Sequence, residues 1–229
     1  MTVAVATPPI EGTGDAWVCI PATWETYLRL LDDRGERSRP RFIYCDGRLT
    51  IVSPGVIHER LKSRLSSMLH EILLGLRIRH ISTGSVTLLP GEADTKGVEG
   101  DASYYLTNFD RLKGRERLVM GVDPPPDLEI EVVVSHPVAD ALAVHASFGV
   151  REVWVCGSGE LTFLVLQPDG RYAPSPTSQN IPVLRSDELS SWLFREGCDE
   201  DLPLLLQFRD WVRDELAARL ANPGGAARP

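Results

Sequence analysis

The chain has 229 residues, of which 43% are hydrophobic and 24% charged, and this composition is typical of a globular protein with a sizeable core. Its formal net charge of −8 argues against nucleic-acid binding driven by bulk charge, because such binders carry a basic face that releases phosphate counterions. A local basic groove is still compatible with this charge. The four cysteines form no CxxC pair, so they suggest neither a zinc knuckle nor a disulfide framework.

No apolar run approaches the ~20 residues that a membrane span needs. The opening MTVAVATPPIEGTG has no basic segment before its short apolar patch, unlike a signal peptide. We therefore expect a cytoplasmic protein that does not contact the membrane. The composition further predicts a flexible tail over residues 1–18, a single domain over residues 19–221 and a second tail over residues 222–229.

The first half of the chain predicts two helices with a hairpin between them. PATWETYLRLLDDRG offers Thr23 as an N-cap, followed by apolar residues at helical spacing. RFIYCDGRLTIVSPG is typical of two short strands joined at Asp46-Gly47, the strongest hairpin signal in the chain. From His58 to Leu76 apolar residues recur every three or four positions, which predicts a long amphipathic helix.

The second half predicts several strands and two further helices. DALAVHASFGV has helical spacing and ends at Gly149, and DLPLLLQFRDWVRDELAARL predicts an amphipathic helix at the C-terminus. Strands are expected in IRHISTGSVTLLP, KGVEGDASYYLTN, DLEIEVVVSH and REVWVCG, and a hairpin in LTFLVLQPDGRYAP. Such an order predicts an α/β or α+β domain whose central sheet is covered by helices.

Two carboxylates interrupt the otherwise apolar strand DLEIEVVVSH. Side chains alternate along a strand, so Leu128 and Ile130 share one face while Glu129 and Glu131 share the other. That second face either meets water or holds a cation, because an unpaired carboxylate removed from water is unstable. On the second interpretation a cation lies beside Glu131, and Glu129 is its exposed or supporting neighbour.

A second acidic pair, Glu99 and Asp101, lies in GVEGDASYY and points to one face if that segment is extended. Enough chain separates Asp101 from Glu131 for a return to a neighbouring strand. Two carboxylates that face one way from adjacent strands make an all-oxygen site suited to Mg²⁺ or Mn²⁺. Such an ion polarises a phosphate and lowers the pKa of a bound water.

Four blocks of the chain follow one another in the order RFIYCDGRLTIVSPGVIHERLKSRLSSML, KGVEGDASYYLTN, DPPPDLEIEVVVSHP and DALAVHASFGVREVWVC. Together they resemble a bacterial family described as "putative restriction endonuclease", within the PD-(D/E)XK nuclease superfamily. The resemblance covers roughly residues 20–215. It implies a restriction-endonuclease-like fold, in which a mixed sheet carries a metal-bound acidic pair. The implied activity is hydrolysis of phosphodiester bonds, with nucleic acid, specifically DNA, as the expected substrate.

The resemblance also implies roles for individual residues. Asp101 matches the family's first metal-binding aspartate, and Glu131 matches the second acidic ligand on the next strand. Glu99 matches a glutamate that usually stands just before that aspartate. His58 and Glu59 match the histidine and acid that open the long helix. The implied metal ligands are therefore Asp101, Glu131 and Glu99.

Several positions depart from the family pattern. Gly100 replaces the proline that usually precedes the aspartate, which loosens the backbone beside a ligand. Val133 replaces the superfamily lysine, which orients the attacking water and offsets charge on the phosphate. Ala141 and His145 stand where relatives carry a basic residue and a tyrosine.

Only three lysines could substitute for the missing one. Lys96, five residues before Asp101, is the nearest in sequence and is our candidate catalytic lysine. Lys62 on the long helix is a second candidate, because an arginine is a poor proton donor or acceptor. The departures also keep open a protein of another class, a nuclease-fold module that has lost catalysis and binds nucleic acid or a protein partner.

Other polar residues are expected to have structural or solvent-exposed roles. The remaining histidines are interpreted as structural or surface residues, namely His70, His80, His136 and His145. One basic cluster is interpreted either as a phosphate-contacting loop or as a solvated turn, namely Arg111, Lys113, Arg115 and Arg117. The apolar stripe of the last helix is interpreted as core or as the surface of a homodimer, and we expect a homodimer.

Overall fold

The computed structural model describes residues 14–91, 95–112, 114–115 and 118–221. The strands are β1 (Ala16–Pro21), β2 (Arg41–Cys45), β3 (Arg48–Ser53), β4 (Ile81–Gly84), β5 (Thr87–Pro90), β6 (Val98–Glu99), β7 (Ala102–Tyr105), β8 (Val119–Met120), β9 (Leu128–Val133), β10 (Glu152–Gly157), β11 (Glu160–Leu166) and β12 (Tyr172–Ser175). The helices are α1 (Trp24–Arg34), α2 (Val56–Gly75), the short η1 (Phe109–Leu112), α3 (Ala139–Phe148), α4 (Ser186–Leu193), α5 (Asp201–Trp211), the π-helical turn η2 (Val212–Leu216) and α6 (Ala217–Ala221).

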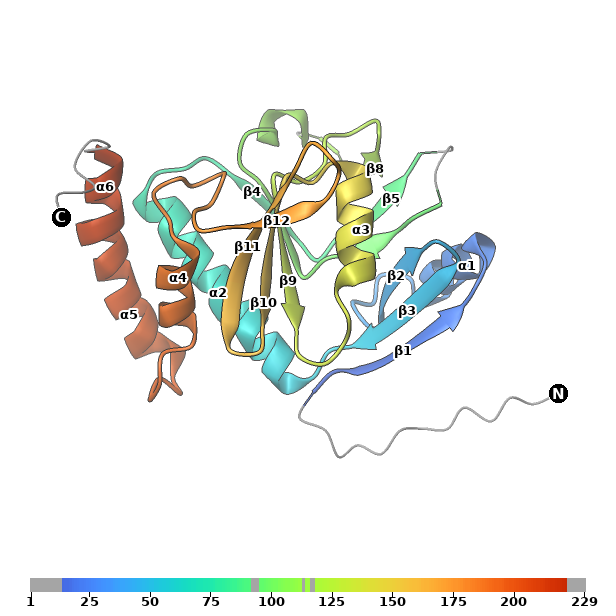
Figure 1. Cartoon of the computed structure of the whole chain (residues 1–229), viewed down its shortest axis with the longest axis horizontal. Helices are drawn as coiled ribbons and strands as arrows, with labels where there is room; N and C mark the ends of the chain where they lie inside the picture. Colours follow the sequence, from blue (N-terminus) through green and yellow to red (C-terminus); the bar gives the residue numbers. More distant parts are fainter. Residues whose placement is uncertain (1–13, 92–94, 113, 116–117, 222–229) are drawn as a thin grey trace.

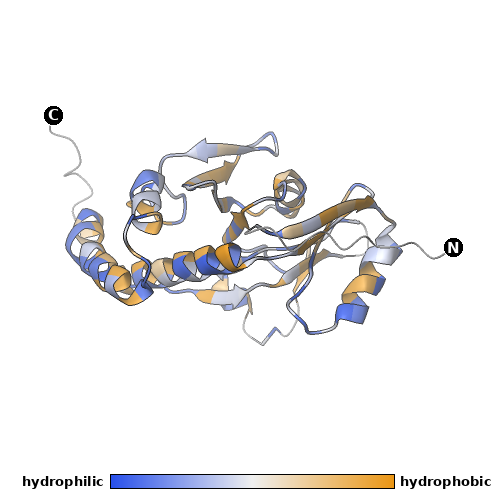
Figure 2. Cartoon of the chain, turned by 90° about the horizontal axis from the view of Figure 1, so that it is seen from below, coloured by the Kyte–Doolittle hydropathy of each residue, from blue (hydrophilic) through white to orange (hydrophobic). Residues whose placement is uncertain are grey.

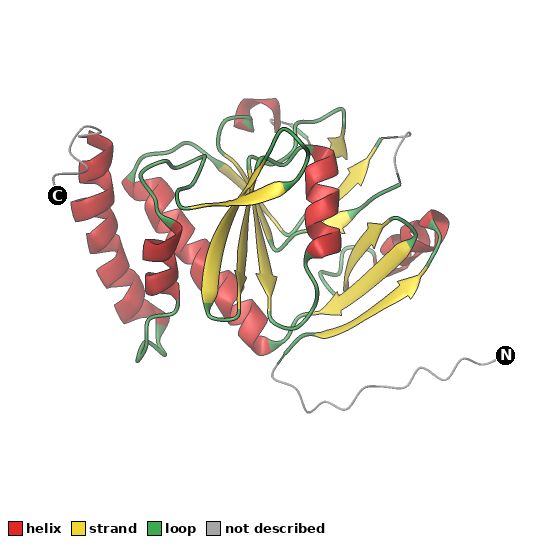
Figure 3. Cartoon of the chain, in the orientation of Figure 1, coloured by secondary structure: helices red, strands yellow, loops and turns green. Residues whose placement is uncertain are grey.

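A central six-stranded sheet has the order β12-β11-β10-β9-β7-β4 (Figure 3). β9 and β10 run parallel, and every other neighbouring pair in this sheet is antiparallel. The parallel connection passes through α3, as a crossover between parallel strands requires. The expected fold class, a mixed central sheet flanked by helices, is therefore confirmed.

The two faces of β9 meet different layers of the molecule. Leu128, Ile130 and Val132 are fully buried in the main core, which also contains the apolar faces of α2 and of the last helix. α3 stands on the opposite face of the sheet (Figure 1) and packs against β2 and β6. Hydrophobic and hydrophilic residues alternate around α2, as an amphipathic helix on a sheet requires (Figure 2). The glutamates of β9 therefore point toward α3.

The first helix and the hairpin form as expected. The Thr23 side chain accepts a hydrogen bond from the backbone N–H of Thr26 at 3.2 Å and so caps α1. β2 and β3 pair across a two-residue turn in which Asp46 and Gly47 both have positive φ, of 48° and 78°. Asp-Gly favours this type of turn because each residue tolerates the left-handed region. The third strand of this small sheet, β1, pairs with β3.

The N-terminal boundary expected at residue 18 is wrong, because β1 already begins at Ala16 and pairs with β3 along its length. Residues 1–13 and 222–229 of the expected tails lie outside the described residues. α4 is a further element that the sequence patterns did not predict. Its apolar residues Leu189 and Leu193 are buried in the main core.

Two segments expected to be continuous strands are each divided between two sheets. Residues 78–90 form β4 in the central sheet and β5 in a separate small sheet, whose order is β6-β5-β8. Residues 96–108 likewise form β6 and then β7, with a break at Gly100 and Asp101. The acidic residue that the resemblance places at the metal therefore lies at a bend between two sheets.

The last helix extends from Asp201 to Ala221 and includes the π-helical turn. Its apolar stripe is buried in the main core, where it supplies Leu204, Phe208, Val212 and Leu216. This stripe is therefore core, and the homodimer stays a prediction. Across the part of the chain that the structure describes, none of the helices has the length and apolar character to cross a membrane.

Asp127 fixes the turn that leads into β9. Its carboxylate accepts hydrogen bonds from the backbone N–H of Leu106 at 2.7 Å and of Thr107 at 2.9 Å, and from the Thr107 hydroxyl at 2.6 Å. Asn108 adds two more, at 3.2 Å from its backbone and 3.0 Å from its side chain. Burial opposes the ionisation of Asp127, but these hydrogen bonds outweigh it and lower the pKa of the carboxyl group.

Asp127→Asn should lower the free energy of unfolding at pH 7 by about 1.5–3 kcal/mol, because hydrogen bonds to a charged acceptor are lost. The stabilisation by Asp127 is present above the unfolded-state pKa of about 4 and disappears as pH falls through the lower folded-state value. In urea unfolding, the difference in the free energy of unfolding between the two proteins should therefore be constant above about pH 5 and become smaller on acidification. A difference that becomes larger on acidification would contradict this account.

Candidate active site

Asp101 and Glu131 converge at one end of the paired strands β7 and β9. The backbone N–H of Asp101 donates to the carbonyl oxygen of Ile130 at 3.0 Å. The backbone N–H of Val132 donates to Asp101 Oδ2 at 2.7 Å. Both carboxylates border one small pocket with about 10 Å³ of water-accessible space, lined by Arg41, Ile43, Val52, His58, Glu99, Asp101, Glu131 and His136. Space of this size corresponds to about one water molecule.

Asp101 is 1% exposed and its charge is compensated by basic side chains. His58 Nε2 lies 2.7 Å from Asp101 Oδ1, and the Arg41 guanidinium forms an ion pair with the same oxygen. Arg41 also lies 3.4 Å from His58 Nε2 and 3.6 Å from a carboxylate oxygen of Glu59. An unpaired buried carboxylate would be unstable, and these contacts account for its burial.

Arg41 is a site residue that the sequence interpretation missed. Burial lowers the pKa of its guanidinium, although the nearby carboxylates of Glu131, Glu59 and Glu99 act in the opposite direction. The available signal was an arginine that opens the otherwise apolar strand RFIYC. That signal is weak, because an arginine at a strand end is usually solvated.

Glu131 is paired with a histidine from α3. His145 Nε2 lies 2.6 Å from Glu131 Oε1, and His145 is fully buried. Of the two roles expected for His145, structural or surface, the surface role is wrong, and its ring contacts one of the two central acids. A protein group thus stands beside Glu131, where the sequence interpretation placed a metal ion.

Glu129 was expected to be either exposed or a supporting neighbour of Glu131. It is fully buried, so the first alternative is wrong. The Ser103 hydroxyl donates to Glu129 Oε1 at 2.5 Å, while Oε2 has no hydrogen-bond partner among the described residues. Burial raises the pKa of this carboxyl group well above its usual value, against the Ser103 hydrogen bond and with the help of the Glu131 charge. Burial therefore favours the neutral form of the Glu129 carboxyl group.

Gly100 leaves the space that the Glu129 carboxyl group occupies. A Cβ atom built on Gly100 would overlap Glu129 Oε2 and would lie 3.6 Å from Glu131 Oε1. Any larger residue here, including the proline common in relatives, would therefore displace a buried carboxyl group. The departure at Gly100 and the buried position of Glu129 are two parts of one local arrangement.

Gly100→Ala should lower the free energy of unfolding by about 1–3 kcal/mol, the usual cost of excess volume in a packed interior. Gly91→Ala is the matched control, because the closest atom to its added Cβ would be a backbone oxygen at 3.8 Å. Urea unfolding curves of both variants measure the difference. Equal free energies of unfolding for the two variants would show that the Glu129 side chain moves aside without destabilising the fold.

Glu99 lines the same pocket but does not share a strand with Asp101. It lies on β6, is 5% exposed and forms an ion pair with Arg34 of α1. The Ser85 hydroxyl lies 3.4 Å from Glu99 Oε1 and donates to the carbonyl oxygen of Gly100 at 2.8 Å. The two acids therefore meet through the bend at residue 100 rather than through strand alternation.

A buried aspartate near the N-terminus links two histidines of the pocket. Asp15 Oδ2 lies 3.2 Å from His58 Nδ1 and 3.0 Å from His136 Nδ1. Asp15 Oδ1 accepts the backbone N–H of Gly55, the residue before α2, at 3.0 Å. Burial opposes the ionisation of Asp15, but hydrogen bonds from His136 and His58 outweigh it and lower the pKa. Asp15 falls in the segment expected to be a flexible tail, and His136 was expected to be structural, so both were missed.

Neither candidate lysine lines the pocket. The charge of Lys96 acts on the thiol of Cys45. Lys62 lies one helical turn after His58 on the same side of α2. Burial and the positive charge of Arg41 both lower the pKa of Lys62. Of the two, only Lys62 is close enough to the site to interact with Arg41.

The oxygen donors of the pocket suit a hard divalent ion in type, since Asp101, Glu131 and Glu99 all line it. Within the described part of the chain, no group of three histidine, cysteine, aspartate or glutamate side chains is arranged to hold a metal. Basic side chains instead contact these acids, namely Arg41, His145 and Arg34. The donors therefore suit Mg²⁺ or Mn²⁺ in type only, and an ion could enter only if Arg41 gave up part of its contact with Asp101.

Comparison with known proteins gives a family. The model of the Uma2 family, described as "Putative restriction endonuclease", matches residues 24–195. The chain belongs to this family. A solved structure with a similar fold is the crystal structure of a "putative nuclease belonging to DUF820" from Anabaena variabilis ATCC 29413. It has a TM-score of 0.52 and 19% sequence identity, over 76% of this chain and 99% of that chain. No curated protein matches the chain.

The Uma2 match includes both central acids, Asp101 and Glu131, and also Arg41, which the sequence interpretation had not assigned to the site. Asp15 lies before the matched residues, although its carboxylate contacts two histidines of the pocket. The likeness to the DUF820 structure shows the fold alone at this level of identity. The basic partners Arg41, His58 and His145 thus lie within the residues that match the Uma2 family, and only Asp15 lies before them.

Proposed function

We propose that this Uma2 protein is a divalent-metal-dependent endonuclease that hydrolyses phosphodiester bonds in DNA. The observation that carries the proposal is the convergence of Asp101 and Glu131, from neighbouring segments of one sheet, on a single buried pocket. Basic side chains surround this pocket, so it offers both oxygen ligands for a cation and positive charge for a phosphate. Membership of the Uma2 family supports nuclease chemistry at such a site.

Asp101 and Glu131 would hold the ion, and Glu99 would complete or support its coordination. The ion, Mg²⁺ or Mn²⁺, would polarise the phosphate and make water a stronger nucleophile. Arg41 would turn its guanidinium from Asp101 toward the phosphate, where its forked donors match phosphate oxygens. Lys62, whose charge interacts with that of Arg41, would add positive charge as the phosphate becomes more negative.

His136 is our proposed proton acceptor in place of the absent lysine. Asp15 accepts from Nδ1 of His136, so the Nε2 atom keeps its lone pair and has no partner among the described residues. By contrast, both ring nitrogens of His58 face carboxylates. In the step we propose, a water O–H proton moves to His136 Nε2 while the water oxygen bonds to phosphorus. The bond from phosphorus to the leaving oxygen breaks, and that oxygen takes its electron pair and a solvent proton.

Purified protein mixed with supercoiled, linear and single-stranded DNA tests the proposal. Cleavage is expected in Mg²⁺ or Mn²⁺ and none in EDTA. Calorimetry should show Mn²⁺ uptake that is lost in Glu131→Gln. Glu71→Gln, which removes the half-buried partner of Arg209 on another part of α2, should not affect uptake. If no DNA form is cleaved in either metal above the EDTA level, the nuclease proposal is wrong.

A second candidate function is a binding module that has lost catalysis. It is favoured by the basic side chains that already contact the acids, namely Arg41, His145 and Arg34. Val133, which replaces the superfamily lysine, also favours this candidate. This candidate predicts DNA binding of equal affinity in EDTA and Mn²⁺ and no Mn²⁺ uptake in calorimetry. Uptake that depends on Glu131 would count against it.

A further inference from the structure

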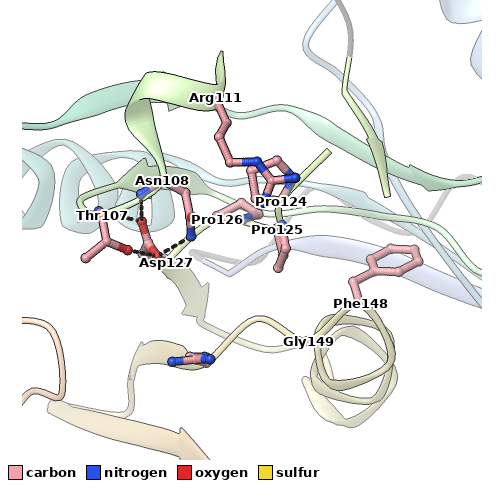
Figure 4. Close-up of a pocket in the computed structure, with 10 residues that line it drawn as sticks. Thr107, Asn108, Arg111, Pro124, Pro125, Pro126, Asp127, Phe148 and Gly149 are labelled. Carbon is pink, nitrogen blue, oxygen red and sulfur yellow. Dashed lines mark hydrogen bonds between the residues drawn. The ribbon is translucent and has the colours of Figure 1, made fainter. Parts of the chain in front are cut away.

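A second and larger hollow lies at the C-terminal end of α3. It has a volume of about 530 Å³ and is formed by the turn after β7, the prolines before β9 and the end of α3. Figure 4 shows Arg111 reaching from η1 over Pro124 and Pro125, with Phe148 on the opposite side. Arg151, just after α3, also lines the hollow.

The two arginines of this hollow are not used by the protein itself. Both are exposed, and neither guanidinium has a hydrogen bond or ion pair in the described part of the chain. Most described arginines are engaged with a carboxylate, a backbone oxygen or an aromatic ring. The described arginines without such a side-chain partner are Arg29, Arg77, Arg111, Arg151 and Arg171. Two of these five share one hollow, and they reach it from different segments.

The acidic residue of the hollow, Asp127, forms no ion pair with either arginine in the described part of the chain. Its carboxylate instead accepts hydrogen bonds from Thr107 and Asn108 (Figure 4) and from the backbone of Leu106. These bonds connect the turn after β7 to the residue before β9, along one rim of the hollow. The apolar floor of prolines and the ring of Phe148 offer contact surface for a flat or apolar group.

We propose that this hollow binds a phosphate group of a nucleic-acid strand through Arg111 and Arg151, with Phe148 and the prolines against the adjoining sugar or base. The choice of a nucleic-acid strand as ligand rests on the proposed nuclease function. Guanidinium groups are well suited to phosphate oxygens, and aromatic rings accept bases by stacking. At physiological ionic strength charges interact over about 8 Å, so two local cations act despite the net negative charge.

The position of the hollow suits a second contact for the substrate. Asp127 stands four residues before Glu131 along β9, a separation of about 13 Å. On α3, His145 contacts Glu131 and Phe148, one turn later, lines the hollow. A strand held by Arg111 and Arg151 is thereby anchored beside the active site without entering it, and such an anchor contributes affinity rather than chemistry.

Binding of a short fluorescein-labelled single-stranded DNA, measured by anisotropy in EDTA, tests this inference without any cleavage. Arg111→Gln and Arg151→Gln should each weaken binding by about 3–10-fold and reduce the salt dependence of log affinity by about 0.7. Arg29→Gln and Arg171→Gln are matched controls, since they remove equally unpartnered arginines elsewhere, and both should stay within about twofold of the unchanged protein. Competition with dAMP measures whether a free nucleotide uses the same hollow.

Equal losses in all four variants would overturn the inference, because bulk charge would then explain the binding. Absence of DNA and dAMP binding by the unchanged protein would also overturn it. Binding of dAMP alone, lost in Arg111→Gln and Arg151→Gln, would retain a phosphate site but overturn the assignment to a strand. DNA binding that needs these arginines, in a protein that never cleaves, would refute the nuclease proposal and leave this inference standing.

Discussion

Asp101→Asn is expected to lower the rate of DNA cleavage by about 10³-fold or more, the largest effect we predict. The substitution removes the negative charge that would hold the cation and keeps nearly the same shape. Its side chain would still accept a hydrogen bond from the Val132 backbone, as Oδ2 does now at 2.7 Å. The initial rate of cleavage in saturating Mg²⁺ or Mn²⁺ measures the effect.

Loss of activity in Asp101→Asn could also reflect instability, because Arg41 would be left buried without its partner. Leaving a buried charge unpaired costs about 3–5 kcal/mol. The double variant Asp101→Asn with Arg41→Met removes both charges and should recover most of that stability. It should remain inactive, and thermal unfolding separates the two effects. Cleavage by the folded double variant at more than a tenth of the original rate would contradict the role of Asp101.

His136→Gln is expected to lower kcat by about 10²-fold or more while leaving the affinity for DNA within about twofold. Glutamine can still donate to Asp15 but cannot accept the proton from water. The rise of kcat with pH that a general base produces should also be lost, which a purely structural role would not cause. Two titratable groups contact His136. The Asp15 carboxylate lies 3.0 Å from its Nδ1 atom, and the ring of His58 stacks on its ring with 6.2 Å between the ring centroids.

Asp15→Asn separates orientation from proton transfer. Asparagine preserves the shape but accepts less strongly from His136 and His58, so kcat should fall by about 10-fold, less than in His136→Gln. His70→Gln is the control histidine, because His70 lies against His80 and Tyr104, away from the acidic pocket. A kcat in His136→Gln equal to that in His70→Gln would remove His136 from the mechanism.

The candidate site was partly accessible from the sequence. Alternation along β9 placed Glu129 and Glu131 on one face, and the resemblance to a nuclease family singled out Asp101, Glu99 and His58. All of these except Glu129 line the same pocket. The basic partners were not accessible, because Arg41 and Asp101 are brought together only when β2 is placed beside the bend that precedes β7. Nothing in either local pattern predicts that pairing.

Lys96 illustrates why proximity in sequence is a poor guide here. It lies five residues before Asp101, but the chain changes sheets at Gly100, so the two side chains are not brought to one pocket. Lys62 is far away in sequence but lies one turn after His58 on α2, and its pKa responds to Arg41. Because of this bend, Lys62 is a better candidate for a role at the site than Lys96, although Lys96 is nearer to Asp101 in sequence.

The sequence by itself determined the elements whose signals act over a few residues. Four such features depend only on neighbours within one or two turns. They are the Thr23 cap, the Asp46-Gly47 turn, the apolar repeat of α2 and the glycine that ends α3 at residue 149. The tertiary structure alone decided which charges meet, such as Asp15 with His136 and His145 with Glu131. Burial makes those pairings strong, and burial depends on how distant segments pack, which no local pattern encodes.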